Sequence, residues 1–165
     1  MSWVKNKAWA DRYMDAVRRI VGPRLLVPAE LEMDRRQATD LLVLKARDMR
    51  IGVRVRREGY AASFGRQFTI RGRAANGGPT ELDKIKEGWG DWLFYGHARG
   101  EADLFPWMIV DLDLLRKIIC GDSVGLPGSW WGTTLNWDGE TGFVWFDVGA
   151  MPGSVLVDQE GVLCP

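Results

Sequence analysis

The chain reads T39-D-L-L-V-L-K-A46 and then R50-I-G-V-R-V-R-R57, and after a turn-rich gap it continues as Q67-F-T-I-R-G-R73. Apolar and polar residues alternate along these three runs, and this alternation favours β-strands over helices. With a tight turn at residues 48–49, the first two runs pair as an antiparallel hairpin and the third run extends it. The sequence therefore predicts a three-stranded antiparallel meander, around which we interpret the rest of the chain.

The predicted meander has one apolar and one cationic face, because successive side chains of a strand point to opposite sides. Its apolar face collects Leu42, Leu44, Ile51, Val53, Val55, Phe68 and Ile70, together with Asp40. Its other face collects the candidate nucleic-acid-binding residues Lys45, Arg47, Arg50, Arg54, Arg56, Arg71 and Arg73, with Leu41, Val43 and Thr69 among them. A strand face this rich in cations indicates a polyanionic partner.

The composition of the 165 residues, 46% hydrophobic and 27% charged, is that of an ordinary globular domain. No apolar run approaches the roughly 20 residues of a membrane-spanning helix. The first residues also lack the apolar core of a signal peptide, so we expect a cytoplasmic protein without membrane contacts.

The net charge of zero conceals an imbalance between the two halves of the chain. Residues 1–75 hold 17 Lys and Arg against 8 Asp and Glu, a net charge of +9. Residues 76–165 hold 5 against 14, a net charge of −9. Two interpretations remain open: the basic half binds a nucleic acid, or the two halves pack together and neutralise each other.

Helices and strands are predicted on both sides of the meander. Residues 3–21 have the apolar spacing of an amphipathic helix, which Gly22-Pro23 ends, and a second helix begins at Pro28. Further predictions are a helix over 81–87 capped by Thr80, strands over 92–95 and 106–110, a helix capped by Asp111 or Asp113 that runs to Ile119, and strands over 133–136, 143–148 and 154–158.

These elements predict a single domain over residues 1–165 of the α/β (α+β) class. Its mixed sheet is built on the meander and flanked by helices. Residues 1–27 form an N-terminal helix, residues 28–120 form the α/β core, and residues 121–165 form a loop followed by the C-terminal strands.

Few residues are candidates for catalysis outside the meander. His97 is the only histidine, so zinc motifs with two histidines are excluded, and Cys120–His97 is the one thiol–imidazole pair that can be considered. Asp111 and Asp113 could bind Mg²⁺, although a helix cap with a first-turn acid is the favoured interpretation. Trp130 and Trp131 lie in a glycine-rich loop and are predicted to be exposed.

A set of acids precedes the cationic strands. Glu30 and Asp34 lie one helical turn apart, and Asp40 opens the first strand on the apolar face, where a carboxylate needs a partner, a metal or solvent. Carboxylates that hold Mg²⁺, followed by a Lys or Arg that stabilises phosphate charge, are the parts of a metal-dependent phosphodiesterase.

The order of Glu30 or Glu32, Asp40, a gap of 13 residues and R54-V-R56 resembles the core of the restriction-endonuclease-like PD-(D/E)XK nucleases. The similarity covers about residues 28–98. It implies Mg²⁺ bound by Asp40 and Glu30, with Arg54 and Arg56 at catalytic positions. Arg54, however, stands where the family has its second metal-binding acid, and Arg56 stands where it has lysine. The resemblance then implies either an inactive site or a migrated acid such as Glu58 or Glu81.

Two functions therefore remain open. The first is a nucleic-acid-binding protein with a nuclease-like core, which hydrolyses phosphodiesters with Mg²⁺ if the acids bind metal. The second is a non-catalytic inhibitor or adaptor that resembles proteins of phages and mobile elements, such as anti-CRISPR proteins acting in anti-defence. It would bind a host protein or nucleoprotein complex through Trp130, Trp131 and the acidic C-terminal half. A homodimer formed through the same loop is a variant of the second function.

Overall fold

The computed structural model describes residues 3–28, 41–43, 49–121 and 130–162. The described helices are α1 (Trp3–Asp11), α2 (Met14–Val21), η1 (Gly22–Leu25), α4 (Ala61–Phe64), α5 (Glu81–Lys86), α6 (Leu112–Cys120) and η2 (Gly153–Val155). The described strands are β1 (Leu26–Pro28), β2 (Leu41–Val43), β3 (Ile51–Arg56), β4 (Gln67–Arg73), β5 (Trp92–Arg99), β6 (Asp103–Asp111), β7 (Trp131–Leu135), β8 (Gly142–Asp147) and β9 (Leu156–Glu160).

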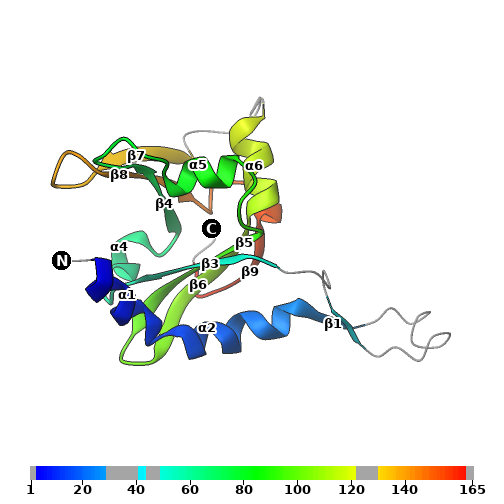
Figure 1. Ribbon diagram of the computed structural model, residues 1–165. Helices are drawn as coiled ribbons and strands as arrows, with labels where there is room; N and C mark the ends of the chain where they lie inside the picture. Colours follow the sequence, from blue (N-terminus) through cyan, green and yellow to red (C-terminus); the bar gives the residue numbers. More distant parts are fainter. Residues whose placement is uncertain (1–2, 29–40, 44–48, 122–129, 163–165) are drawn as a thin grey trace.

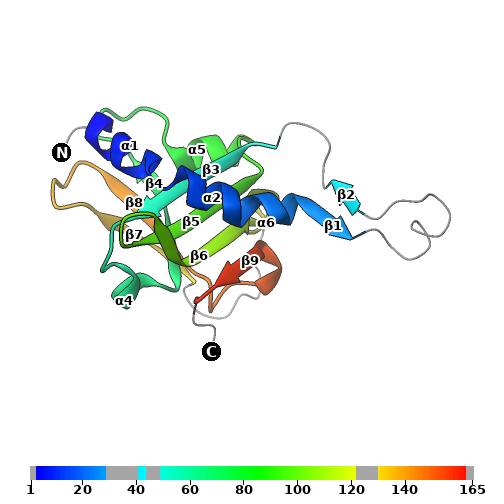
Figure 2. The same ribbon diagram turned by 90° about the horizontal axis from the view of Figure 1, so that it is seen from below.

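The described strands form a mixed four-stranded sheet in the order β3-β5-β6-β9 and an antiparallel three-stranded sheet in the order β4-β8-β7. A short ribbon of β1 and β2 accompanies them. Helix α2 covers one side of the four-stranded sheet, and the three-stranded sheet, α5 and α6 lie on its other side (Figure 1). Figure 2 shows α2 crossing the four-stranded sheet, with the β1–β2 ribbon beyond its end. The predicted α/β domain with a mixed sheet is confirmed.

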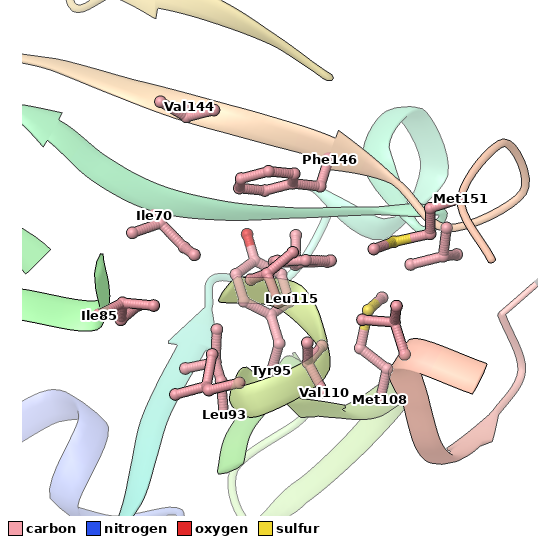
Figure 3. Packing of buried hydrophobic residues seen from close by; sticks show 14 of the residues in the cluster. Ile70, Ile85, Leu93, Tyr95, Met108, Val110, Leu115, Val144, Phe146 and Met151 are labelled. Carbon is pink, nitrogen blue, oxygen red and sulfur yellow. The ribbon is translucent and has the colours of Figure 1, made fainter. Parts of the chain in front are cut away.

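The larger apolar cluster fills the space between the two main sheets. In Figure 3, side chains of the four-stranded sheet meet those of the three-stranded sheet, and residues of α5 and α6 close the side of the cluster. Its labelled members are Ile70, Ile85, Leu93, Tyr95, Met108, Val110, Leu115, Val144, Phe146 and Met151. The rings of Phe68 and Phe146 stack with their centroids 4.8 Å apart, which joins β4 to β8 through side chains as well as backbone.

Strand β5 is buried on both faces. Leu93 and Tyr95 point into the cluster between the sheets, whereas Trp92 and Phe94 point into a second cluster beneath α2. A strand covered on both sides needs a continuous apolar run rather than alternation. The run W92-L-F-Y95 meets that need, and the buried strand predicted there is confirmed.

The predicted meander is wrong. Strand β3 runs parallel to β5, with Ile51 opposite Trp92, while β4 pairs with β8 and β2 pairs with β1. The alternation within β3 is correct for Ile51 and Val55, which pack towards the cluster beneath α2, and for Arg54, which reaches α5 on the other side. Val53, predicted on the same apolar face, is 37% exposed. Alternation determines which face of a strand is buried but not which strand lies beside it. The predicted turn at residues 48–49 also lacks the Gly or Asn that favours a two-residue hairpin.

The predicted helix over residues 3–21 is two helices. Helix α1 ends at Asp11 and α2 starts at Met14, and between them Tyr13 is 2% exposed. The Tyr13 hydroxyl donates a hydrogen bond to the carbonyl oxygen of Gly100 at 3.0 Å, which fixes the break against the β5–β6 turn. The second helix was predicted to begin at Pro28, but Pro28 is the last residue of strand β1 and pairs with Leu41, so that start is wrong. Residues 29–40, over which the predicted helix continues, lie outside the described residues.

The remaining predicted elements are confirmed to within a few residues. Thr80 caps α5 in a capping box with Asp83, whose pKa is lowered by the hydrogen bonds from Thr80. Gly88 ends this helix at a φ of +95°. The Asp111 carboxylate accepts hydrogen bonds from the backbone of Asp113 and Leu114, so the capping interpretation is correct. Of the helices described, none is long and apolar enough to cross a membrane.

Candidate functional site

Arginines of two edge strands converge in one groove. Strand β3 is at the edge of the four-stranded sheet and β4 is at the edge of the three-stranded sheet. Together with α1 and the turn that follows β3, they enclose a groove of about 330 Å³. We call it the arginine groove, and it is lined by Asn6, Trp9, Ala10, Arg54, Val55, Arg56, Arg57, Tyr60 and Arg71.

Arg54 is tied to the neighbouring helix. Its guanidinium forms an ion pair with the carboxylate of Glu81, the first residue of α5. The same Glu81 oxygen accepts a hydrogen bond from the backbone N–H of Arg71 at 3.1 Å. One carboxylate thus joins β3, β4 and α5 at the groove, and it offsets the charge of Arg54.

Arg56 and Arg71 bring positive charge that no carboxylate offsets within the described residues. The Arg56 guanidinium lies over the ring of Tyr60, 4.8 Å from its centroid, and this contact orients it without neutralising it. Arg71 is exposed, and its backbone, rather than its side chain, contacts Glu81. These two guanidinium groups are therefore available to an anion in the groove.

Arg57, the residue after β3, contacts the side of the groove that α1 forms. Its guanidinium lies 4.8 Å from the ring centroid of Trp9, and it donates a long hydrogen bond of 3.5 Å to Asn6 Oδ1. These contacts place α1 against the end of β3. The sequence interpretation missed Asn6, Trp9, Arg57 and Tyr60 as site residues. The available signal was the run R54-V-R-R57 with an aromatic residue three positions later.

The other predicted nucleic-acid contacts do not join this groove. Arg50 lies before β3, where it pairs with Asp91 and its guanidinium lies over the ring of Trp89. Arg73, two residues beyond Arg71, lines a separate hollow beside the end of β4. Lys45 and Arg47 lie outside the described residues. Of the seven predicted nucleic-acid-binding residues, Arg54, Arg56 and Arg71 line the groove. They do not form one continuous strand face, because β3 and β4 belong to different sheets.

His97 lies on β5, the strand next to β3, and is opposite Arg56 in the pairing of the two strands. It is 1% exposed, and neither ring nitrogen has a hydrogen-bond partner in the described structure. Burial, reinforced by the charge of Arg56, lowers the pKa of His97 to about 4, so the ring is neutral at pH 7. Because Cys120 is exposed and neither His97 nitrogen bonds to it, the considered Cys120–His97 pair is not formed.

The described residues do not fit a magnesium site of the nuclease type. No group of three His, Cys, Asp or Glu side chains within them could hold a metal ion. Glu81 forms an ion pair with Arg54, and Glu58 accepts a hydrogen bond from the backbone of Gly100 at 3.4 Å. The predicted metal ligands Asp40 and Glu30 lie outside the described residues.

The exposed tryptophans differ from those predicted. Trp130 is buried in the cluster between the sheets, at 4% exposure, so its predicted exposure is wrong. Trp131 is half-exposed on the edge strand β7, as predicted. Trp137, at the tip of the β7–β8 hairpin, is 99% exposed. The sequence signal for it was the adjacent turn residues Asp138-Gly139, which indicate a hairpin tip.

Comparison of the chain with protein-family models, with curated proteins and with solved structures found no match in any of the three.

Proposed function

We propose that the protein binds nucleic acid through phosphate contacts in the arginine groove. The observation that carries the proposal is the convergence of Arg54, Arg56, Arg57 and Arg71 on one groove, with Arg56 and Arg71 unneutralised by the described residues. Arginine presents a planar fork of donors that matches phosphate oxygens, and such contacts supply most of the affinity for a nucleic acid.

Contacts around the groove hold two of its guanidinium groups in position, which supports a binding site over a general excess of surface charge. Arg54 is fixed by Glu81 and Arg56 by Tyr60, so both guanidinium groups are positioned before a ligand arrives. A positioned side chain loses less conformational entropy on binding than a free one. We limit the proposal to binding, because the two acids that hydrolysis would need, Glu30 and Asp40, lie outside the described residues.

Replacing Arg56 and Arg71 together with alanine is expected to weaken nucleic-acid binding by about 10- to 100-fold, because two charge-assisted phosphate contacts are lost. Fluorescence anisotropy with labelled DNA and RNA oligonucleotides at two salt concentrations measures this. For a single strand, the slope of log affinity against log salt should fall by about 1.4, or about 0.7 for each lost contact.

The matched control is Arg73→Ala. Arg73 lies on the same strand as Arg71, two residues away, but outside the groove. The Arg73→Ala variant should have nearly the same affinity for nucleic acid, and nearly the same dependence of affinity on salt, as the wild-type protein. Equal losses in Arg73→Ala and Arg71→Ala would show that the groove is not the binding site, and an affinity independent of salt would exclude phosphate contacts.

A second candidate function, that of an inhibitor or adaptor, is favoured by Trp137. Its hairpin tip is held by hydrogen bonds from the backbone and hydroxyl of Thr141 to Asp138, so the exposed ring projects from a fixed turn. Exposed tryptophans on fixed elements are frequent anchors of protein interfaces.

A photo-crosslinking residue at position 137 is expected to join the protein to one defined partner in its native host cell. The matched control carries the same residue at position 15 of α2, where the Asp15 side chain is 82% exposed. Identical crosslinked products from both positions would count against a specific interface at Trp137.

A further inference from the structure

The short helix α4 separates the arginine groove from a second hollow. This α4 hollow, of about 530 Å³, lies between α4, the start of β4, the first half of β6, the end of β8 and the residue that follows β9. Tyr60 lines the arginine groove, and Phe64 lines the α4 hollow. Since the centroids of these two rings are 6.3 Å apart, the groove and the hollow adjoin each other along α4.

A row of exposed aromatic rings follows this path. Tyr60 is 45% exposed, Phe64 is 48% exposed, and Phe105, which also lines the α4 hollow, is 36% exposed. Two of the rings form cation–π contacts: the Arg56 guanidinium lies over Tyr60, and the Arg99 guanidinium lies over Phe105, 4.9 Å from the ring centroid. Burial of these rings in the core would stabilise the fold, but in this structure the rings are accessible to a ligand.

The charge is distributed unevenly along the path. The groove end has Arg56 and Arg71, which no described carboxylate neutralises. Arg66, the one arginine among the described residues that line the α4 hollow, is paired with Asp147 at 3.2 Å. The groove end therefore suits phosphates, and the α4 end offers mainly ring surface. Phosphate contacts alternating with ring surfaces are the pattern by which proteins hold a single strand.

We propose, building on the function proposed above, that the arginine groove and the α4 hollow form one track for single-stranded nucleic acid. Arg56 and Arg71 contact the phosphates, and Tyr60 and Phe64 stack on successive bases. In a duplex the base faces are already stacked on one another, so these rings have nothing to contact. The track therefore selects unpaired strands by stacking and not by base sequence.

Anisotropy titrations with four labelled probes test this: a 12-nucleotide oligo(dT), an oligo(rU) of equal length, a blunt 12-base-pair duplex, and an abasic 12-mer that keeps the phosphates. We expect at least one unpaired strand to bind more tightly than the duplex and the abasic probe. Tyr60→Ala and Phe64→Ala should each weaken that binding by about 5- to 150-fold, the equivalent of about 1–3 kcal/mol per stacked base.

Three controls isolate the stacking. Tyr60→Phe keeps the ring and should retain the affinity. Trp89→Ala removes an exposed aromatic ring outside both the groove and the hollow and should leave the affinity unchanged. Binding of the abasic probe should respond to Arg56→Ala/Arg71→Ala but not to Phe64→Ala, because Phe64 does not contact Arg56 whereas Tyr60 orients it. Thermal denaturation confirms that each variant is folded.

The outcomes separate this inference from the proposed function. If the duplex binds as tightly as the unpaired strands, or if the two ring variants bind normally, the single-strand track is wrong while nucleic-acid binding stands. If none of the four probes binds the wild-type protein at low salt, the proposed function fails, and the track fails with it.

Discussion

Replacing Phe94 with alanine is expected to lower the free energy of unfolding by about 3–5 kcal/mol. The ring is completely buried in the cluster beneath α2, where it stacks on Trp107 with the centroids 6.3 Å apart. Its removal leaves a cavity that α2 and the sheet can only partly fill. Since small domains are stable by about 5–15 kcal/mol, this one change removes a large part of the total. Urea denaturation monitored by tryptophan fluorescence measures the loss.

A substitution at Gly96 tests whether the Phe94 ring packs against this glycine. A Cβ atom added to Gly96 would lie 2.9 Å from the Phe94 ring, so the ring occupies space that only a glycine leaves open. Gly96→Ala alone should destabilise the protein, and it should cost less in the Phe94→Ala background, where the ring is absent. Trp137→Ala, at a 99% exposed position, should stay within about 0.5 kcal/mol of wild type. Strict additivity of the two core changes would contradict this packing.

Between pH 6.5 and pH 4 the protein is expected to lose about 3 kcal/mol of folding stability through His97. The pKa of His97 is lowered to about 4 in the fold, mainly by burial and further by Arg56, against 6.5 when unfolded. The unfolded chain therefore binds the proton first, and stability falls as the pH drops through this window. Above pH 6.5 both states are neutral, and the contribution is fully present.

Urea titrations of wild type and His97→Leu at pH 7.5, 6 and 5 measure this effect. Because His97 is the single histidine, the variant should lose most of the pH dependence over this range. Hydrogen bonds lower the pKa values of Asp83, Asp103 and Asp138 from 3.8, so their contributions to stability are lost mainly below about pH 5, under the three measured pH values. If the free energy of unfolding of His97→Leu depends on pH as strongly as that of wild type, protonation of His97 does not destabilise the folded protein, and the prediction is wrong.

Local chemistry in the sequence was enough to place most of the elements. Thr80 and Asp83 predicted the start of α5, and Gly88 predicted its end, because a cap depends on residues within one turn. The run W92-L-F-Y95 predicted a strand buried on both faces. Alternation also predicted that Phe68 and Ile70 would be buried. Each of these features depends on neighbours along the chain, and the sequence alone determined them.

Tertiary structure decided which strands pair and where the arginines meet. The parallel pairing of β3 with β5 joins residues about 40 positions apart, and alternation contains no information on such a partner. That pairing left β3 and β4 as facing edges of different sheets, so Arg56 and Arg71 converge while Arg50 and Arg73 do not. The exposure of Trp137 and the burial of Trp130 were likewise decided by packing between distant segments. The sequence thus determined most of the elements and the faces of several strands, whereas contacts between distant residues assembled the groove.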